Sequence, residues 1–152
     1  MHAIKKDTLK QLFEITEDVR DSVQPVLSIE IGEKHFCFSI TDFASQELKK
    51  LVYYNAEEIN DDFLSELFSA HPVLTHSFYQ TLVCFDYPQS CLVPSKSYRH
   101  EDGAFLMSTI TGIATAAAVI SETINEWQVN NLYTVPQKVH DRISKTFLTG
   151  KY

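Results

Sequence analysis

Hydrophobic and polar side chains alternate twice in residues 26–40, once on each side of a glycine. Leucine and isoleucine occupy positions 27, 29 and 31, and phenylalanine and isoleucine occupy positions 36, 38 and 40. Successive side chains of a strand point to opposite faces of its sheet, so this period of two predicts two strands. Gly32, Glu33 and Lys34 lie between them and predict the turn of an antiparallel hairpin, in which Gly32 supplies unusual backbone angles.

The N-terminal part of the chain has its apolar residues at a different spacing. Within residues 7–20 they recur near one face of a helix, and Asp7 is a candidate N-cap. We expect a short amphipathic helix there, separated from the first strand by Pro25. The predicted organisation is a helical extension over residues 1–25, followed by one domain over residues 26–152. The residues of the helical face are Leu9, Leu12, Phe13, Thr16 and Val19.

Residues 60–69 carry the clearest helical pattern in the chain. Apolar residues at positions 63, 64, 67 and 68 form one stripe, which we interpret as core packing. Asn60 can cap this helix, and Asp61 and Asp62 in its first turn suit the helix dipole.

Residues 78–85 are rich in apolar side chains on both faces, which predicts a central strand covered on both sides. Residues 91–94 are then expected to pair back on this strand or to continue the sheet. Cys84 and Cys91 lie symmetrically about the intervening turn, so a hairpin would let them face each other. The simpler interpretation is that both are small core residues.

Weaker patterns complete the chain. Residues 47–55 fit a helix or a strand by propensity, and we favour a strand because of the resemblance described below. The remaining predicted elements are a short helix over residues 104–108, strands over residues 117–124 and 127–135, and a helix that Pro136 opens and Gly150 closes.

The composition is that of an ordinary globular protein. The chain has 152 residues, of which 44% are hydrophobic and 12% aromatic, and only 4 are Gly and 5 Pro. This is enough for one domain with a substantial core. The net charge of -7 disfavours a phosphate-backbone or anionic-membrane partner, so we expect no nucleic acid and no membrane.

Cysteine content and apolar segments bear on the cellular compartment of the protein. The 3 cysteines are an odd number without a Cys-x-x-Cys pair, which fits reduced thiols. The N-terminus lacks an apolar signal segment, and the longest small apolar run, residues 112–120, is shorter than the roughly 20 residues that span a bilayer. We therefore expect a cytoplasmic protein.

The order of the predicted elements indicates an α/β (or α+β) fold in which three antiparallel strands lead a mixed sheet. It resembles one half of an actin-like ATPase domain, the ribonuclease-H-like fold. Four phrases are similar to an uncharacterised Bacteroidetes family, a domain of unknown function with an actin-like fold. The resemblance covers about residues 26–147. Family members are typically longer and have two related halves, of which this chain resembles the first. The phrases are residues 27–32, 36–40, 92–94 and 131–136.

The resemblance indicates where a phosphate loop would lie in this chain. Actin-like ATPases carry Asp-x-Gly on the first strand, and the matching residues here are Glu30, Ile31 and Gly32. Glutamate is one methylene longer than aspartate, and the acid Glu33 would repel a triphosphate, although Lys34 could compensate. The second glycine-rich loop of such proteins is missing. Glu30, Gly32 and Lys34 are thus candidates for a degenerate Mg-ATP site.

A second implication of the same fold is metal-dependent nuclease activity. Ribonuclease-H-like nucleases place metal-binding carboxylates on the first strand, the first helix and the fourth strand. The matching candidates are Glu30, Asp61 or Asp62, and Asp86. The helix acids are better explained by the helix dipole, and Asp86 by a turn.

Other candidate sites are weaker. His71 and His76 have neither helical nor strand-like ligand spacing, and Trp127 is expected in the core. One of Tyr53 and Tyr54 is expected to be buried, and exposed aromatics could anchor an interface. We therefore expect a non-catalytic domain that acts by protein binding or assembly, as a homodimer or with a protein partner. The alternative is a nucleotide-binding module completed by a second chain.

Overall fold

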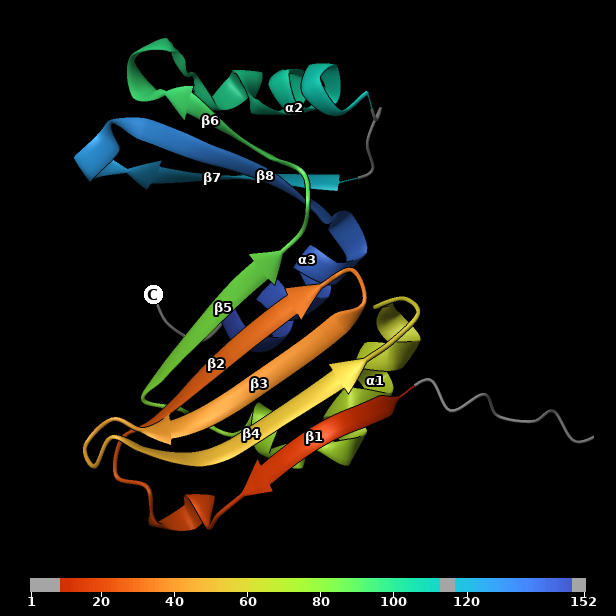
Figure 1. The fold of residues 1–152 in the computed structure, drawn as a ribbon, viewed down its shortest axis with the longest axis vertical. Coiled ribbons are helices and arrows are strands. Elements are labelled where there is room, and N and C mark those ends of the chain that lie inside the picture. Colours follow the sequence, from red (N-terminus) through yellow and green to blue (C-terminus); the bar gives the residue numbers. More distant parts are fainter. Residues whose placement is uncertain (1–8, 113–116, 149–152) are drawn as a thin grey trace, which may run out of the picture. The chain divides into compact units, whose positions relative to one another are not determined.

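The computed structural model describes residues 9–112 and 117–148 of the chain (Figure 1). They form two compact units. Unit 1 comprises the residues up to Asp86 together with those from Arg142 onward, and unit 2 comprises Tyr87–Asp141. Each unit is described by itself. The predicted single domain over residues 26–152 stays a prediction, because two compact units can belong to one domain.

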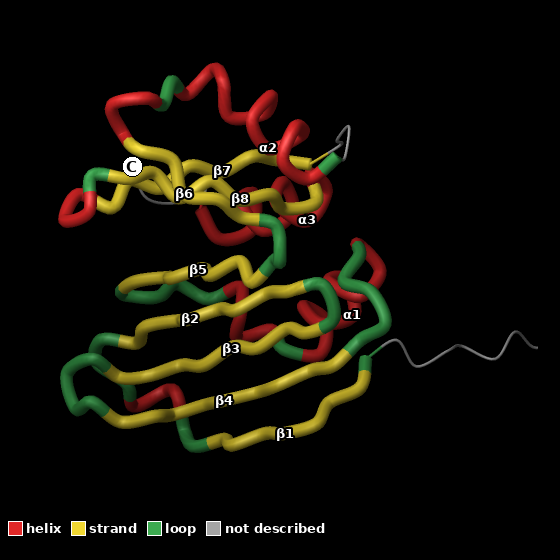
Figure 2. Tube along the Cα trace, turned by 45° about the horizontal axis from the view of Figure 1, so that its top comes forward, coloured by secondary structure: helices red, strands yellow, loops and turns green. Residues whose placement is uncertain are grey.

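Unit 1 is built on a five-stranded mixed sheet, in which the strands lie in the order β1-β4-β3-β2-β5 (Figure 2). The pairs β2–β3, β3–β4 and β1–β4 are antiparallel, and β2–β5 is parallel. The predicted hairpin and the predicted three antiparallel strands are thereby confirmed. The strands are β1 (Lys10–Thr16), β2 (Pro25–Gly32), β3 (His35–Asp42), β4 (Glu47–Asn55) and β5 (Gln80–Asp86).

The core of unit 1 lies between one face of this sheet and helix α1 (Asp61–Ala70), which is behind the sheet in Figure 1. The side chain of Asn60 accepts a hydrogen bond from the backbone N–H of Phe63 at 3.0 Å, so the predicted N-cap is confirmed. Phe63 is 1% exposed, and its ring lies 6.4 Å from that of Phe36 and 6.3 Å from that of Tyr54. The apolar stripe of the helix is therefore core packing, as predicted.

The predicted N-terminal helix is wrong, because the described part of that segment contains strand β1. Phe13 lies opposite Tyr53 of β4, and Ile15 lies opposite Leu51. The register shifts between Gln11 and Phe13, which places one extra residue in the strand. This bulge interrupts the period of two and makes the apolar spacing look helical. Only Val19–Asp21 is helical, as one 3-10 turn.

Strand β5 exists as predicted, but it is an edge strand and not a central one. Its side chains alternate between exposed and half-buried, and Leu82 is 49% exposed. Strand β6 (Ser90–Pro94) does not return to it but pairs with β8 in another sheet. Cys84 and Cys91 therefore do not belong to one hairpin. The favoured interpretation of both as small core residues is wrong for Cys84, which is exposed, and Cys91 is half-buried.

Unit 2 has a three-stranded antiparallel sheet in the order β6-β8-β7, with β7 at Ala117–Ile124 and β8 at Val129–Pro136. Helix α2 (Gly103–Thr111) packs on it through Met107, whose Sδ lies 3.6 Å from Sγ of Cys91. These elements confirm the predicted strands and short helix. Trp127 lies in the turn before β8 and is 70% exposed, so its predicted burial is wrong.

Helix α3 (Gln137–Ile143) follows β8 directly and continues as a π-helical turn, Ser144–Leu148. Val139 and Ile143 are buried, as the predicted spacing requires. In unit 1, the ring of Phe147 packs edge-on against Phe68 at 5.7 Å. The predicted cap Gly150 and the proposed N-cap Asp7 lie outside the described residues. Among the residues described, no helix is long and apolar enough to cross a membrane.

Candidate functional site

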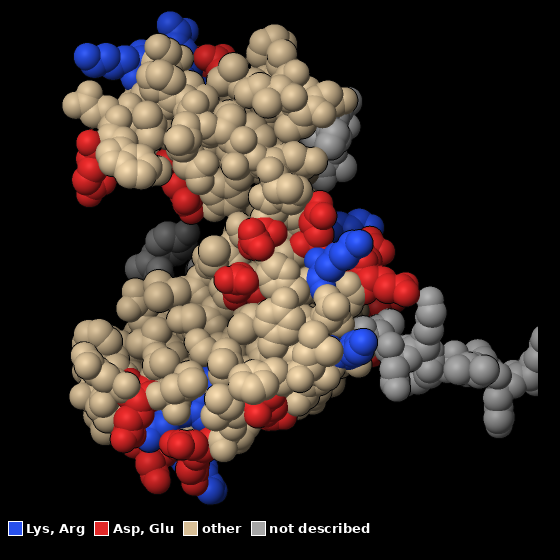
Figure 3. Space-filling view, in the orientation of Figure 1, with Lys and Arg blue, Asp and Glu red and all other residues tan. Residues whose placement is uncertain are grey.

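The face of the five-stranded sheet opposite α1 carries exposed and half-buried side chains, and we call it the open face. Phe13 and Ile15 of β1 are 49% and 39% exposed on it, next to half-buried Leu51 and Tyr53 of β4. Figure 3 views this side of the sheet and shows a largely uncharged surface with few charged groups away from its margins. The open face of unit 1 is thus exposed and can contact another molecule.

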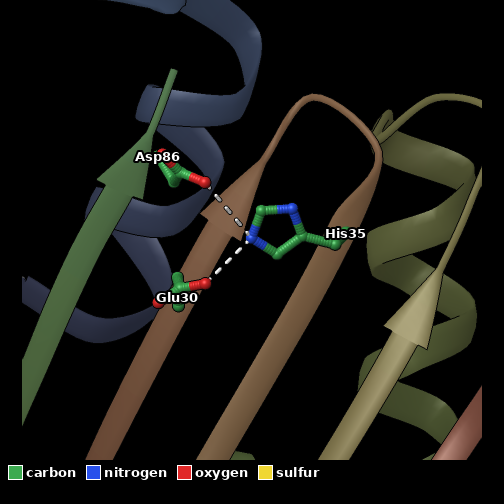
Figure 4. A group of neighbouring side chains, drawn as sticks. All are labelled: Glu30, His35 and Asp86. Atoms are coloured by element: carbon green, nitrogen blue, oxygen red, sulfur yellow. Dashed lines mark hydrogen bonds and ion pairs between the residues drawn. The ribbon is translucent and has the colours of Figure 1, made fainter. Parts of the chain in front are cut away.

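Three potential metal ligands meet on the open face where strands end. Glu30 lies near the end of β2, His35 begins β3 and Asp86 ends β5 (Figure 4). The Nε2 atom of His35 is 3.0 Å from Oε1 of Glu30 and 3.8 Å from Oδ2 of Asp86. All three donor atoms lie within 4.8 Å of one another. We call these residues the Glu-His-Asp cluster.

Sheet register explains why these residues meet. The parallel pairing of β2 and β5 puts Gly32 opposite Asp86, so the carboxyl ends of both strands coincide. The β2–β3 hairpin has only two residues between its strands, which returns His35 to the same end. Glu30 is on the same face because it lies two residues before Gly32.

The imidazole of His35 is held between two neighbours. On one side its ring is stacked on Tyr53, with 5.9 Å between centroids and an interplanar angle of 2°. On the other side is Gly32, where an added Cβ would lie 2.7 Å from Nδ1 of His35 and 2.9 Å from the carbonyl oxygen of Asp86. The side chain of His35 is accordingly only 18% exposed.

The expected role of Gly32 is therefore corrected. Gly112 is the only described glycine with a positive φ, so the β2–β3 turn does not draw on left-handed backbone angles at Gly32. What requires glycine is the close approach of an imidazole and a backbone carbonyl, because any side chain would occupy their place.

The cluster combines one nitrogen and two carboxylate groups. Protonated imidazole can donate from Nε2 to a carboxylate, and neutral imidazole can offer the Nε2 lone pair to a metal that both carboxylates also bind. Cys37 is the neighbour of Glu30 across the β2–β3 ladder. Burial and, secondarily, the charge of Glu30 raise the pKa of the Cys37 thiol, which keeps it protonated and weak as a ligand.

The sequence-predicted site residues fall into two groups. The structure brings Glu30, Gly32 and Asp86 together. Lys34 is exposed in the turn, and its carbonyl accepts a hydrogen bond from Ala56 N–H at 2.8 Å. The acids at positions 61 and 62 are in the first turn of α1, as the helix-dipole interpretation expected, and are not part of the cluster.

Sequence reasoning missed His35. The alternating pattern had already placed it on the polar face of the hairpin, the face that also carries Glu30. A two-residue turn, if assumed, would have put the two side chains at the same end. The approach of Asp86 depends on the parallel pairing of β5, and no local pattern specifies that pairing.

The fold of the chain is that of the actin-like ATPases. A solved structure from Bacteroides thetaiotaomicron, described as a protein with an actin-like ATPase fold and unknown function, superposes with a TM-score of 0.73 at 15% sequence identity. The match covers 88% of this chain and 53% of that chain, so this chain spans about half the length of the Bacteroides protein. At this identity the likeness shows the fold alone.

The family follows from the sequence itself. Residues 15–152 match the family described as "Protein of unknown function (DUF3822)", and the chain belongs to this family. The resemblance to a Bacteroidetes domain of unknown function with an actin-like fold is thereby confirmed. A search of the curated proteins found no match.

Proposed function

We propose that this chain is an actin-like domain that acts by contact with another polypeptide, a second copy of itself, and that it does not hydrolyse ATP. The observation that carries the proposal is the open face of unit 1. Sheets in α/β proteins usually bury both faces, whereas a solvated sheet face is usually polar. Phe13 and Leu82 on this face are each 49% exposed.

The apolar side chains of the open face lie toward both margins of the sheet, and Ser28 and Ser39 lie between them. Phe13 and Ile15 lie on the edge strand β1, Tyr53 and Leu51 lie on the adjoining β4, and Leu82 lies on the opposite edge strand β5. Aromatic residues are enriched where proteins associate, and exposed apolar side chains gathered on one face mark interaction sites.

A second copy is the occupant that we propose. Twofold dimers are the commonest assemblies of soluble proteins. Two copies that each carry a net charge of -7 repel each other, so the contact must be apolar and should strengthen with salt.

The proposed absence of ATP hydrolysis is supported by the surroundings of Gly32. In the phosphate-loop hypothesis, the backbone at this glycine approaches a phosphate. Here the ring of His35 and the carbonyl oxygen of Asp86 lie where even a Cβ would clash. Gly32 is itself buried, so a phosphate could reach its backbone only if neighbouring groups moved, and it would also meet the carboxylate of Glu30.

The nuclease alternative has two of its carboxylates in place, Glu30 and Asp86. The third position, on the helix, is not filled, because Asp61 and Asp62 are exposed in the first turn of α1 and are outside the cluster. The net charge of -7 also opposes nucleic-acid binding.

Light scattering of the purified chain tests the proposal. We expect twice the 17.4 kDa chain mass at high micromolar concentration, with a larger dimer fraction at higher salt. Phe13→Glu and Leu82→Glu should each give monomers, because they place charge in the apolar contact. The matched control is Val23→Glu, at a side chain that is 78% exposed in the connector before β2.

Two results would contradict this proposal. One is a mass of 17.4 kDa for the unaltered chain at every concentration and salt tested. The other is a dimer that Val23→Glu dissociates as well as Phe13→Glu does, which would locate the contact away from the open face.

A further inference from the structure

We propose that Glu30, His35 and Asp86 bind a divalent transition-metal ion without any nucleotide, and that Zn²⁺ binds more tightly than Mn²⁺ or Mg²⁺. This site is independent of the proposed dimer. It also differs from both metal sites expected from the sequence, because its ligands include His35 and exclude Lys34, Asp61 and Asp62.

The spacing of the donor atoms fits a single ion. Protein nitrogen and oxygen ligands lie about 2.0–2.2 Å from zinc in a tetrahedral arrangement, so they are roughly 3.4 Å from one another. The observed separations from Nε2 of His35 are 3.0 Å to Oε1 of Glu30 and 3.8 Å to Oδ2 of Asp86. These two values bracket the separation required, and small side-chain rotations would equalise them.

The site is already arranged before an ion arrives. The stacking of Tyr53 on one side of His35 and the contact with Gly32 on the other leave its Nε2 directed at both carboxylates (Figure 4). Fixed orientation of a ligating imidazole by its neighbours raises metal affinity. The three ligands are also on hydrogen-bonded strands of one sheet, which limits their relative movement.

Charge and exposure also suit a metal. Two carboxylates neutralise a divalent ion, which a histidine alone does not. The side chains of Glu30 and Asp86 are 52% and 68% exposed, so the ion can enter from solvent and water can complete its coordination. Three protein ligands with an open position are the arrangement of zinc sites that bind a further ligand.

The nitrogen ligand determines the class of metal. Mg²⁺ and Ca²⁺ prefer oxygen ligands only, whereas imidazole suits zinc and its neighbours. For a given set of nitrogen and oxygen ligands, affinity rises from Mn²⁺ to Zn²⁺. We therefore expect the order Zn²⁺, Mn²⁺, Mg²⁺.

Thiols near the site require a control. Glu30 is flanked in the sheet by Cys37 on β3 and Cys84 on β5, and zinc also binds thiolates. Neither cysteine belongs to the group of atoms within 4.8 Å of one another.

Calorimetric titration of the EDTA-treated chain with zinc chloride, manganese chloride and magnesium chloride tests the proposal. We expect one zinc per chain, and the binding isotherms should show lower affinity for Mn²⁺ and the lowest for Mg²⁺. Glu30→Gln and Asp86→Asn should each lower zinc affinity by at least about tenfold, because even changes behind the ligands have effects of this size. Glu33→Gln is the control, since it removes an equal charge from an exposed residue of the adjoining turn.

Three outcomes would overturn the proposal. They are no saturable zinc binding, an equal loss in Glu33→Gln and Glu30→Gln, and binding that survives Glu30→Gln but is lost in Cys37→Ser. His35→Gln should also weaken binding. If that variant fails to fold by circular dichroism, the two carboxylate variants decide the matter, because both side chains are more than half exposed.

Discussion

At the residue scale, Gly32 has the largest consequence for the site. It lets the imidazole of His35 lie close to the end of β2 while the ring stacks on Tyr53. This arrangement sets the direction of Nε2. Gly32 is itself buried, so its backbone can contact a phosphate only if neighbouring groups move.

Alanine at position 32 is expected to displace His35. The new Cβ would lie 2.7 Å from Nδ1 and 2.9 Å from a carbonyl oxygen of β5, so ring and backbone must shift. Overpacking of this kind costs about 1–3 kcal/mol in the free energy of unfolding. Urea denaturation should show that loss, and zinc titration should show weaker binding.

Gly112→Ala provides the comparison. Gly112 has φ +68° and no heavy atom within 4 Å of an added Cβ, so its cost is backbone strain alone, roughly 1–2 kcal/mol. Zinc affinity should not change in this variant. Equal zinc affinity in Gly32→Ala and the unaltered chain would contradict the role assigned to Gly32.

The positions and roles of individual residues were partly predictable from the sequence. Alternation placed Glu30 on the first strand of the hairpin and His35 on its polar face. It assigned Gly32 to the turn, whereas Gly32 is the last residue of β2. It could not give the function of Gly32, because a glycine needed for close approach and one needed for a positive φ look alike in a sequence. The sequence likewise could not place Trp127 in a turn, since burial of one aromatic residue depends on what packs over it.

At the scale of elements, a buried hydrogen bond connects α1 to the sheet. His71 ends α1, and its Nε2 is 2.6 Å from the hydroxyl of Tyr54 in β4. That hydroxyl in turn donates to the side chain of Gln11 in β1 at 3.1 Å. Tyr54 and His71 are 3% and 8% exposed, so this network lies inside unit 1.

Acidification should weaken this connection. Burial, and to a lesser degree the charge of Lys50, lowers the pKa of His71 below its ordinary value of 6.5. The unfolded chain then binds the proton more readily, so the stabilising contribution is complete above about pH 6.5 and is lost as the pH falls below it. Denaturation between pH 7 and pH 5 should show decreasing stability.

His71→Gln should reduce this pH dependence, because glutamine can keep a hydrogen bond to Tyr54 but does not titrate in this range. His76→Gln removes an exposed histidine and should leave the pH dependence unchanged. Identical pH profiles for His71→Gln and the unaltered chain would show that another group is responsible.

Elements that follow local rules were predictable, and those that depend on distant partners were not. The β2–β3 hairpin and α1 both have uninterrupted apolar patterns, and the N-cap of α1, Asn60, directly precedes the helix in the sequence. Strand β1 was mistaken for a helix because its bulge adds a residue and β4 supplies its hydrogen bonds. The separate pairing of β5 and β6 was missed because two neighbouring strands with a short connection usually form a hairpin.

At the scale of the whole molecule, the chain has an actin-like fold and belongs to DUF3822. Fold by itself does not determine activity, which depends on the groups at a site. Here the end of β2 carries a glutamate and a buried glycine, and Nε2 of His35 at the start of β3 lies near the carboxylates of Glu30 and Asp86. These features favour a metal ion at that position and oppose a triphosphate.

The most direct test of this central claim is calorimetric titration of the purified chain with magnesium-ATP, paired with Glu30→Ala. We expect no saturable heat in either protein at physiological ATP concentrations, because His35 and the carbonyl of Asp86 cover Gly32. Saturable binding in the unaltered chain that disappears in Glu30→Ala would contradict the claim. It would make residues 30–34 a working phosphate loop and restore the nucleotide-binding alternative.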